Sequence, residues 1–519
     1  MDWNRAVIGI EFGSTRIKAV LMDENHLPVA SGSYDWENQF VDGIWTYSMD
    51  EIHKGMHECY ADLARDVKEQ FGTDLTKVGA LGISGMMHGY LPFDAEGNLL
   101  VPFRTWRNTI TGEAAEKLTK LFGFNIPQRW SIAHLYQAIL NKEPHIDKIA
   151  YITTLAGYIH WKLTGKKVMG IGEASGMFPI DSEALDFNQS MVEKFDEISG
   201  MPWKFRDIFP KVLVAGDDAG ILTEEGVKFL DPSGKLEAGI PLAPPEGDAG
   251  TGMAATNSVR VRTGNVSAGT SDFAMLVTEK NPGVHREIDM VTTPSGMPVA
   301  MVHCNNCTSD LNAWGNLLKE FAGLLGVELN LGQVLTMMFQ KSLEADEDCG
   351  GLLSYNYFSG EGVTDIDEGR PVFLRKPDAN LSFANFGRAN VMSALATLKV
   401  GLDILINEEK VTVDKLYGHG GFFKTPVAGQ KMLSAACGVP VSVMKTAGEG
   451  GPYGMALLSA YMINREDGET LEDYLDNKVF ADAESSTVMA EPELVRSFDA
   501  YLDAYVKTFP VERAAVNLF

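Results

Sequence analysis

Two similar strand–turn–strand patterns, about half a chain apart, constrain the fold more than any other feature of this sequence. In the first pattern, residues 6–22, two apolar runs flank the polar turn 11–15. In the second, residues 259–277, two apolar runs flank the turn 268–272. A short polar turn between apolar runs predicts a β-hairpin. Its recurrence predicts two domains built on one plan.

The segments around these hairpins alternate between helical and strand periodicity. Residues 50–71 place Ile52, Met56, Tyr60 and Leu63 on one helical stripe. Such alternation predicts an α/β fold. Further helices are expected at 151–163, 389–406, 454–463 and 492–506, and further strands at 27–30, 78–84 and 415–417.

The length of 519 residues predicts two large domains or three small ones, and the repeated pattern favours two. We place the boundary at residue 258, which gives an N-terminal domain at 1–258 and a C-terminal domain at 259–519. The second is expected to end in a helical extension from about residue 465.

Composition and charge exclude several classes of function. The chain holds 44 Lys and Arg against 70 Asp and Glu, a formal charge of −26. Nucleic acids and anionic membranes bind clustered basic residues, so neither is an expected partner. No stretch of about 18 apolar residues is apparent, so no membrane span is predicted. A homodimer is possible, because dimers are the commonest symmetric assembly.

Cysteine usage indicates a reducing cytoplasm. Five cysteines in so long a chain do not form a disulfide framework. Cys304 and Cys307 have the spacing of half a zinc site, but no second pair follows at suitable spacing. A structural turn is therefore the favoured interpretation of this pair, with a metal or redox site as the alternative.

The first candidate motif is the turn from Glu11 to Lys18. Gly13 can take a positive φ and lets backbone N–H groups point at a phosphate. The hydroxyls of Ser14 and Thr15 and the charge of Lys18 would add to such a site. A carboxylate at Glu11 can bind Mg²⁺ through water. An ordinary polar hairpin is the alternative.

Two glycine-containing turns follow in the second half. Gly269 and Thr270 repeat the glycine–hydroxyl pattern, which suits phosphate oxygens. The run 418–425 follows a predicted strand, so a nucleotide could lie on its glycines. Its Lys424 resembles the lysine of a Walker A loop, but Phe423 replaces the required glycine, so we reject that interpretation.

Polar residues among small ones indicate a sugar site and a base. Asp248 lies in a glycine-rich run, where a carboxylate could accept the proton of an attacking hydroxyl. Met87 and His88 follow a strand and could line a sugar pocket, with Trp106 and Asn108 as a further wall. The alternatives are a helix-capping Asp248, a structural His88 and a packed Trp106.

Taken in order, these motifs resemble the FGGY family of carbohydrate kinases, in the xylulokinase and L-ribulokinase branch. Residues 11–18 and 267–272 look like its two phosphate loops, and 82–89 like its substrate loop. Residues 246–252 resemble its catalytic segment, and 418–426 its adenosine motif. The run 448–456 is similar to the family's helix beside the nucleotide.

The resemblance implies two actin-like domains of the ribonuclease H-like (ASKHA) superfold, with a cleft between them. It implies a cytoplasmic enzyme that transfers the γ-phosphate of ATP, with Mg²⁺, to a terminal hydroxyl of D-xylulose or L-ribulose. Asp248 would be the general base and Glu11 the metal-binding residue. Sugar would bind to Met87, His88, Trp106 and Asn108. The nucleotide would bind to Gly13, Ser14, Thr15, Lys18, Gly269, Thr270, Gly420, Gly421 and Lys424.

Several residues depart from the family pattern. Glu11 stands where the family has Asp, and the extra methylene moves the carboxylate by about 1.5 Å. Asn108 replaces a common Asp, and Asp272 replaces the last glycine of the second phosphate loop. A non-catalytic sugar- or nucleotide-binding relative, a kinase of another ketose or polyol, and an ATPase switch remain as alternatives.

Overall fold

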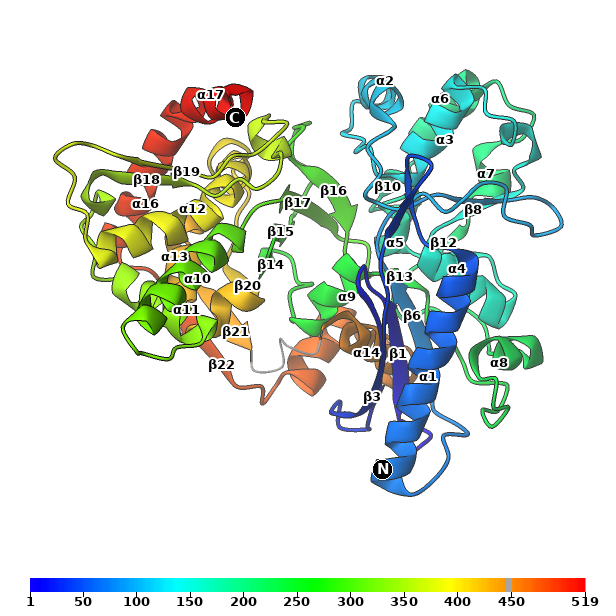
Figure 1. Cartoon of the computed structure of the whole chain (residues 1–519). Coiled ribbons are helices and arrows are strands. Elements are labelled where there is room, and N and C mark those ends of the chain that lie inside the picture. Colours follow the sequence, from blue (N-terminus) through cyan, green and yellow to red (C-terminus); the bar gives the residue numbers. More distant parts are fainter. Residues whose placement is uncertain (445–449, 519) are drawn as a thin grey trace. The chain divides into compact units, whose positions relative to one another are not determined.

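The structure is a computed structural model that describes residues 1–444 and 450–518. Its internal contacts divide the chain into two compact units (Figure 1). The described residues of unit 1 are 1–259, 290–299 and 450–482, and those of unit 2 are 260–289, 300–444 and 483–518. Gly448 and Glu449, the first two residues of the motif 448–456, lie outside the described residues.

The main sheet of unit 1 has five strands in the order β13-β6-β1-β2-β3. β1 pairs antiparallel with β2 and parallel with β6, and β6 pairs parallel with β13. The first predicted hairpin is therefore confirmed as β1–β2. The strands are β1 (Val7–Phe12), β2 (Arg16–Met22), β3 (Pro28–Asp35), β6 (Ala80–Gly85) and β13 (Glu246–Gly247).

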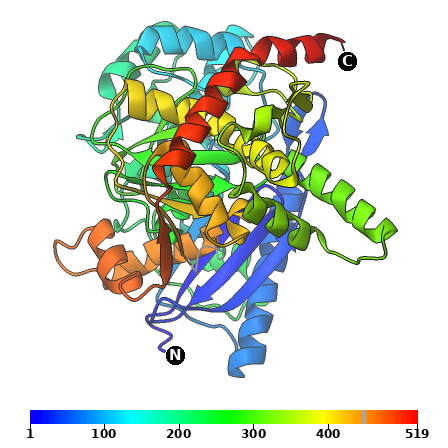
Figure 2. The same cartoon turned by 90° about the vertical axis from the view of Figure 1, so that its left-hand side faces the viewer.

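Helix α1 (Met49–Phe71) lies along this sheet (Figures 1 and 2). The Ser48 side chain caps its N-terminus by accepting a hydrogen bond from the Glu51 N–H, and Gly72 ends it in the left-handed conformation. Its apolar stripe is buried against the strands, as the periodicity predicts.

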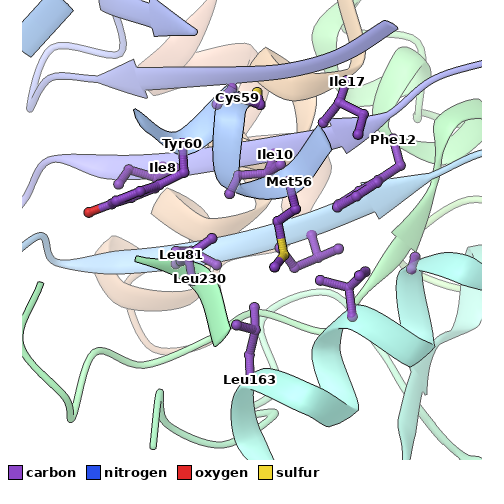
Figure 3. Close-up of a cluster of buried hydrophobic side chains, with 14 of the residues drawn as sticks. Ile8, Ile10, Phe12, Ile17, Met56, Cys59, Tyr60, Leu81, Leu163 and Leu230 are labelled. Atoms are coloured by element: carbon purple, nitrogen blue, oxygen red, sulfur yellow. The ribbon is translucent and has the colours of Figure 1, made fainter. Parts of the chain in front are cut away.

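The core of unit 1 forms between α1, the sheet and the helices beyond it. Figure 3 shows side chains of β1, β2, α1, β6, α4 (Leu155–Thr164) and α8 (Glu224–Leu230) packed together. Burying such apolar side chains stabilises the fold by roughly 1.5–3 kcal/mol each. The labelled residues are Ile8, Ile10, Phe12, Ile17, Met56, Cys59, Tyr60, Leu81, Leu163 and Leu230.

Shorter elements complete unit 1. Its other helices are α2 (Gly112–Phe122), α3 (Ser131–Leu140), α4 (Leu155–Thr164), α5 (Ile171–Ala174), α6 (Gln189–Ser199), α7 (Phe205–Ile208), α8 (Glu224–Leu230), α9 (Asp248–Ala255), α14 (Gly450–Asn464) and α15 (Leu471–Tyr474). Its two-stranded ladders are β4–β5 (Gln39–Val41, Ile44–Thr46), β7–β8 (Leu91–Phe93, Tyr151–Thr153), β9–β12 (Val168–Gly170, Lys211–Leu213) and β10–β11 (Ile180–Asp181, Asp186–Phe187).

The second large sheet repeats the plan of the first. Its strand order is β16-β17-β15-β14-β20-β21-β22. β14 pairs antiparallel with β15 and parallel with β20, as β1 pairs with β2 and β6. Two units on one α/β plan are thus confirmed. The strands are β14 (Thr263–Ala268), β15 (Asp272–Val277), β16 (Asp289–Thr292), β17 (Pro298–Cys304), β20 (Lys415–His419), β21 (Val441–Met444) and β22 (Ser485–Val488).

Unit 2 also contains the longest apolar helix of the described chain. Residues Phe383–Glu408 have the length and mean hydropathy, 1.5, of a membrane span, which our reading of the sequence overlooked. However, 78% of its most apolar window is buried inside the protein, as in a core helix. The remaining elements are α10 (Ser309–Leu324), α11 (Leu331–Ser342), α12 (Phe383–Asp403), α13 (Ala428–Cys437), α16 (Pro492–Lys507), α17 (Phe509–Leu518) and the ladder β18–β19 (Leu352–Tyr355, Val372–Arg375).

Two local predictions are wrong. Residues 151–153 form strand β8 instead of the first turn of a helix, because they pair with β7, which lies about 60 residues earlier. Residues 259–261 precede β14 and are not part of it. The expected helices at 50–71, 454–463 and 492–506 are confirmed with small shifts at their ends.

Candidate active site

Three parallel strands of unit 1 bring the candidate residues to one edge of the sheet. β1, β6 and β13 run in the same direction, so their carboxyl ends lie together. Glu11 is the penultimate residue of β1, Met87 follows β6, and Asp248 follows β13.

Asp248 is the first residue of α9, and Gly247 is the N-cap of that helix. Its Oδ1 accepts a hydrogen bond from the Met87 N–H at 3.1 Å. Burial raises the pKa of Asp248, while the Met87 and Ala249 amides lower it. The Asp248 side chain itself remains exposed to solvent, so the site contains an accessible carboxylate that is more basic than usual and held at two points.

Glu11 lies close enough to Asp248 for the two carboxyls to interact. The pKa of Glu11 is raised to about 7, because desolvation and the charge of Asp248 raise it more than Lys18 lowers it. Lys18 pairs directly with Glu11 across β1 and β2. A Cβ added at Gly451, on α14, would lie 1.3 Å from Glu11 Oε2, so only glycine leaves this carboxylate in place.

The hairpin between β1 and β2 exposes the Ser14 and Thr15 side chains. Gly13 can take a positive φ but is not among the described glycines that do so. Its N–H donates to the Arg16 carbonyl at 3.1 Å, so it is not directed at a ligand. Glycine is needed here for space, because a Cβ would lie 2.9 Å from the Arg16 carbonyl oxygen.

Met87 and His88 are both buried beside α5 and the turn that follows it. His88 has a positive φ of 70°, and its Nδ1 lies 3.2 Å from the Gly176 carbonyl oxygen. The ring stacks on Trp130 at a centroid distance of 6.3 Å. The Met87 backbone bonds to Asp248, so this loop positions the candidate base.

Trp106 and Asn108 have structural contacts in unit 1. The Asn108 amide donates to the Trp45 and Thr105 carbonyls at 2.8 and 2.9 Å, and its oxygen accepts from the Trp45 N–H at 2.9 Å. Trp106 is partly buried and packs against the hydrophobic core. The Asn108 side chain thus fixes the backbone around Trp45.

Reading the sequence did not single out Glu246, which lies two residues before Asp248. This fully buried carboxylate accepts hydrogen bonds from the N–H groups of Gly172, Glu173 and Gly247 at 3.2, 2.9 and 3.3 Å. Burial raises the pKa of Glu246 to about 7, and these amides lower it. Glu246 therefore ties α5 to the strand that precedes α9.

Glu173, on α5, is a second buried acid that the sequence analysis missed. No hydrogen-bond donor contacts either carboxylate oxygen among the described residues. Burial raises the pKa of Glu173 well above its ordinary value, the Thr154 hydroxyl lowers it, and Asp248 and Glu246 raise it. An acid among small residues, Gly172-Glu173-Ala174-Ser175-Gly176, was the available sequence signal.

In unit 2, the hairpin between β14 and β15 is supported by the turn after β17. Cys307 N–H donates to the Thr270 carbonyl at 2.9 Å, and Thr308 N–H donates to the Gly269 carbonyl at 3.0 Å. The Thr308 hydroxyl also donates to the Gly269 carbonyl, at 2.6 Å. The segment from Cys304 to Cys307 is thus a turn that fixes the backbone of Gly269 and Thr270.

Acidic groups lie behind this second hairpin. Glu361 Oε2 accepts hydrogen bonds from the N–H groups of Asn305 and Asn306 at 2.9 and 3.3 Å, so it stabilises the turn. Burial raises the pKa of Glu361 to about 7. Burial also raises the pKa of Asp272 well above its ordinary value, Glu361 raises it further, and the Cys304 thiol lowers it.

A cavity of about 800 Å³ lies within unit 2, in the size range of small-molecule sites. Gly421, Phe422 and Lys424 form one side of it. Gly420 lies at the end of β20, and a Cβ there would lie 2.5 Å from the Ala268 carbonyl oxygen, next to the second hairpin. Helices α10 and α11 supply the opposite side with Leu311, Asn312, Leu331, Leu335 and Phe339.

The structure therefore groups the predicted residues by unit. Glu11, Lys18, Met87, His88 and Asp248 belong to unit 1, as do the hydroxyls of the first hairpin. Gly269, Thr270, Gly420, Gly421 and Lys424 belong to unit 2. Among the described residues, no three His, Cys, Asp or Glu side chains are placed to bind a metal by themselves.

Comparison with known protein families finds matches to both domains of one family. The model "FGGY family of carbohydrate kinases, N-terminal domain" matches residues 6–249, and the C-terminal domain model matches 264–463. A xylulose kinase of Haemophilus influenzae is 22% identical over 479 residues, which cover 85% of this chain and 91% of that protein.

Solved structures of related folds cover nearly the whole chain. The ligand-bound xylulose kinase from Lactobacillus acidophilus has a TM-score of 0.79 at 18% identity and covers 98% of both chains. The gluconate kinase from Lactobacillus acidophilus has a TM-score of 0.78 at 17% identity, again over 98% of both chains. These similarities confirm the predicted actin-like fold.

Proposed function

Since the chain belongs to the FGGY family of carbohydrate kinases and is a sugar kinase, we propose that it transfers the γ-phosphate of ATP to a terminal hydroxyl of a ketopentose, D-xylulose or L-ribulose. The observation that carries the proposal is the solvent-accessible Asp248, fixed by the Met87 amide at the carboxyl end of the central strands. Support for the ketopentose comes from the Met87-His88 pair and from the relative named xylulose kinase.

Asp248 is the general base in this proposal. It accepts the proton of the sugar hydroxyl, whose oxygen forms a bond to the γ-phosphorus. Met87 orients the carboxylate, and burial keeps its pKa high enough to accept a proton. Met87, His88, Trp106 and Asn108 are the proposed sugar-side residues; Asn108 acts by fixing the backbone around Trp45.

Unit 2 suits the nucleotide. ATP, when bound, supplies the phosphoryl group and leaves as ADP. The apolar cavity lined by Leu311, Leu335 and Phe339 fits an adenine ring, with Gly420, Gly421 and Lys424 beside it. We assign the phosphates to Gly269 and Thr270 of the second hairpin and to Gly13, Ser14, Thr15 and Lys18 of the first.

Glu11 is the residue that would hold Mg²⁺. Its half-buried carboxylate lies near Asp248, and a cation there would relieve the repulsion that helps to raise its pKa. Among the described residues, no group of three His, Cys, Asp or Glu side chains surrounds Glu11. Mg²⁺ suits such a site, because it usually binds one or two carboxylates and keeps water and phosphate as its other ligands. Mg²⁺, when bound, neutralises the charge that develops on the transferring phosphoryl group.

A sugar-dependent ADP-release assay tests the substrate. We expect the highest kcat/KM with D-xylulose or L-ribulose in a panel that also contains ketohexoses, polyols and gluconate. ADP release without any sugar would favour an ATPase switch. No turnover with any member of the panel would favour a non-catalytic binding protein.

Asp248→Asn tests the base. Removing a general base costs about 10²–10⁴-fold in kcat. The surface variant Asp147→Asn, also in unit 1, serves as the matched control and should retain full activity. Near-normal kcat in Asp248→Asn, with the sugar bound normally, would contradict the assignment.

A further inference from the structure

Glu173 is a buried acid beside the proposed base to which the proposed mechanism gives no task. It lies on α5 and is completely buried, and its carboxyl faces Asp248 on α9 and Glu246 on β13. A buried carboxyl without a stated role needs an explanation, because an unpaired charge in the interior is strongly destabilising.

Hydrogen-bond donors distinguish the three carboxyls. Glu246 receives three backbone N–H groups. Asp248 receives the Met87 N–H and lies at the N-terminus of α9, where a negative charge is favourable. Among the described residues, no backbone N–H donates to the Glu173 carboxyl, and the Thr154 hydroxyl is the neighbour that favours its charged form. Of the three, Glu173 therefore stabilises a negative charge least.

Packing places Glu173 directly behind the base. A Cβ added at Gly247 would lie 2.4 Å from Glu173 Oε2 and 2.3 Å from Met87 Cγ. The Glu173 carboxyl and the Met87 side chain thus pack against the residue that immediately precedes Asp248. Any movement of the Glu173 carboxyl would displace the start of α9, and with it the base.

We propose that Glu173 is a positioning residue that holds a proton, so that Asp248 and Glu246 can carry negative charge side by side. As an uncharged carboxylic acid, Glu173 fills the space against Gly247 without repelling the base. The inference rests on the proposed role of Asp248.

Ionisation of Glu173 would disturb the site. The titratable groups facing it are Asp248 and Glu246, and the His88 ring contacts the same segment at the Gly176 carbonyl. A third negative charge would repel both carboxylates and favour protonation of Asp248, which would then no longer act as a base. Activity should therefore fall at alkaline pH as Glu173 loses its proton.

Glu173→Gln tests this, because glutamine copies the uncharged acid and cannot ionise. With ketopentose and ATP, we expect kcat within about threefold of wild type at neutral pH, and none of the alkaline loss of activity that wild type shows. Glu183→Gln, an exposed glutamate in the same unit, is the matched control and should keep the alkaline fall. A Glu173→Gln protein that is folded but loses more than about 100-fold in kcat would overturn the proposal.

Infrared difference spectroscopy of the whole protein gives a readout independent of turnover. The spectrum of wild type minus Glu173→Gln should contain the carbonyl band of a protonated carboxylic acid, and Asp248→Asn should retain that band. A band that is missing from the difference, or lost in Asp248→Asn, would place the proton elsewhere and refute the inference. Normal activity of Asp248→Asn would refute the base assignment alone and leave the location of the proton intact.

Discussion

At the scale of single residues, Gly451 tests whether the Glu11 carboxylate must occupy its present position. In Gly451→Ala, the new Cβ would meet Glu11 Oε2 at 1.3 Å, so the Glu11 side chain must turn away. Because the end of a flexible side chain gives way, we expect the protein to fold. We also expect the Mg²⁺ concentration for half-maximal activity to rise by about 10–100-fold, as for other losses of ligand positioning.

Gly252→Ala is the matched control for this prediction. A Cβ at Gly252, on α9, meets nothing within 4 Å, and alanine favours the helix by about 1 kcal/mol. Its Mg²⁺ titration should equal that of wild type. Equal titration curves for Gly451→Ala and Gly252→Ala would show that Glu11 does not bind the ion.

Some functional residues were accessible from the sequence and others were not. Glu11 and Asp248 lie in short motifs with glycine and hydroxyl neighbours, which carry their own signal. Glu173 and Glu246 become meaningful only through contacts between segments about 75 residues apart, which bring their carboxyls together. Gly13 serves the hairpin through its small size and not through a positive φ, because a Cβ there would lie 2.9 Å from the Arg16 carbonyl oxygen.

At the scale of elements, the second hairpin depends on the turn that begins after Cys304. Thr308→Val removes the hydroxyl that donates to the Gly269 carbonyl at 2.6 Å while keeping the size of the side chain. Losing one such bond costs about 1 kcal/mol. We expect KM for ATP to rise about fivefold, equivalent to that energy, with KM for the sugar unchanged.

Thr336, on α11, lines the same cavity as Thr308. Thr336→Val is therefore the matched control, because it replaces a hydroxyl by a methyl group in that cavity without touching the hairpin. It should leave both KM values unchanged. If KM for ATP rose equally in Thr308→Val and Thr336→Val, the change in the cavity, and not the lost hydrogen bond to the hairpin, would be the cause.

Helices and strands were predictable from the sequence where their packing partners lie nearby in the chain. The β1–β2 and β14–β15 hairpins form between sequence neighbours, so apolar runs and a polar turn suffice. Strand β8 was mistaken for helix because its partner β7 lies far away in the sequence. Likewise, the return of residues 450–482 to unit 1 depends on packing of α14 against β1 and α9, which no local pattern indicates.

At the scale of the whole molecule, buried acids make stability depend on pH. Burial raises the pKa of Glu11, Glu246 and Glu361 to about 7, from 4.5. The unfolded chain releases these protons at lower pH than the folded protein does, so the free energy of unfolding should fall as pH rises through about 4.5 to 7. Each group can contribute roughly 3 kcal/mol to this fall.

Thermal unfolding between about pH 5.5 and pH 8.5 checks this, in buffer without Mg²⁺ or nucleotide. Both units hold at least one of these carboxyls, Glu361 in unit 2 and the others in unit 1, so any separate transitions should both move to lower temperature as pH rises. In Glu11→Gln, the unit 1 transition should shift less steeply, because one linked proton is lost. A midpoint that rises with pH across this range would mean that these acids are ionised and stabilised in the folded protein.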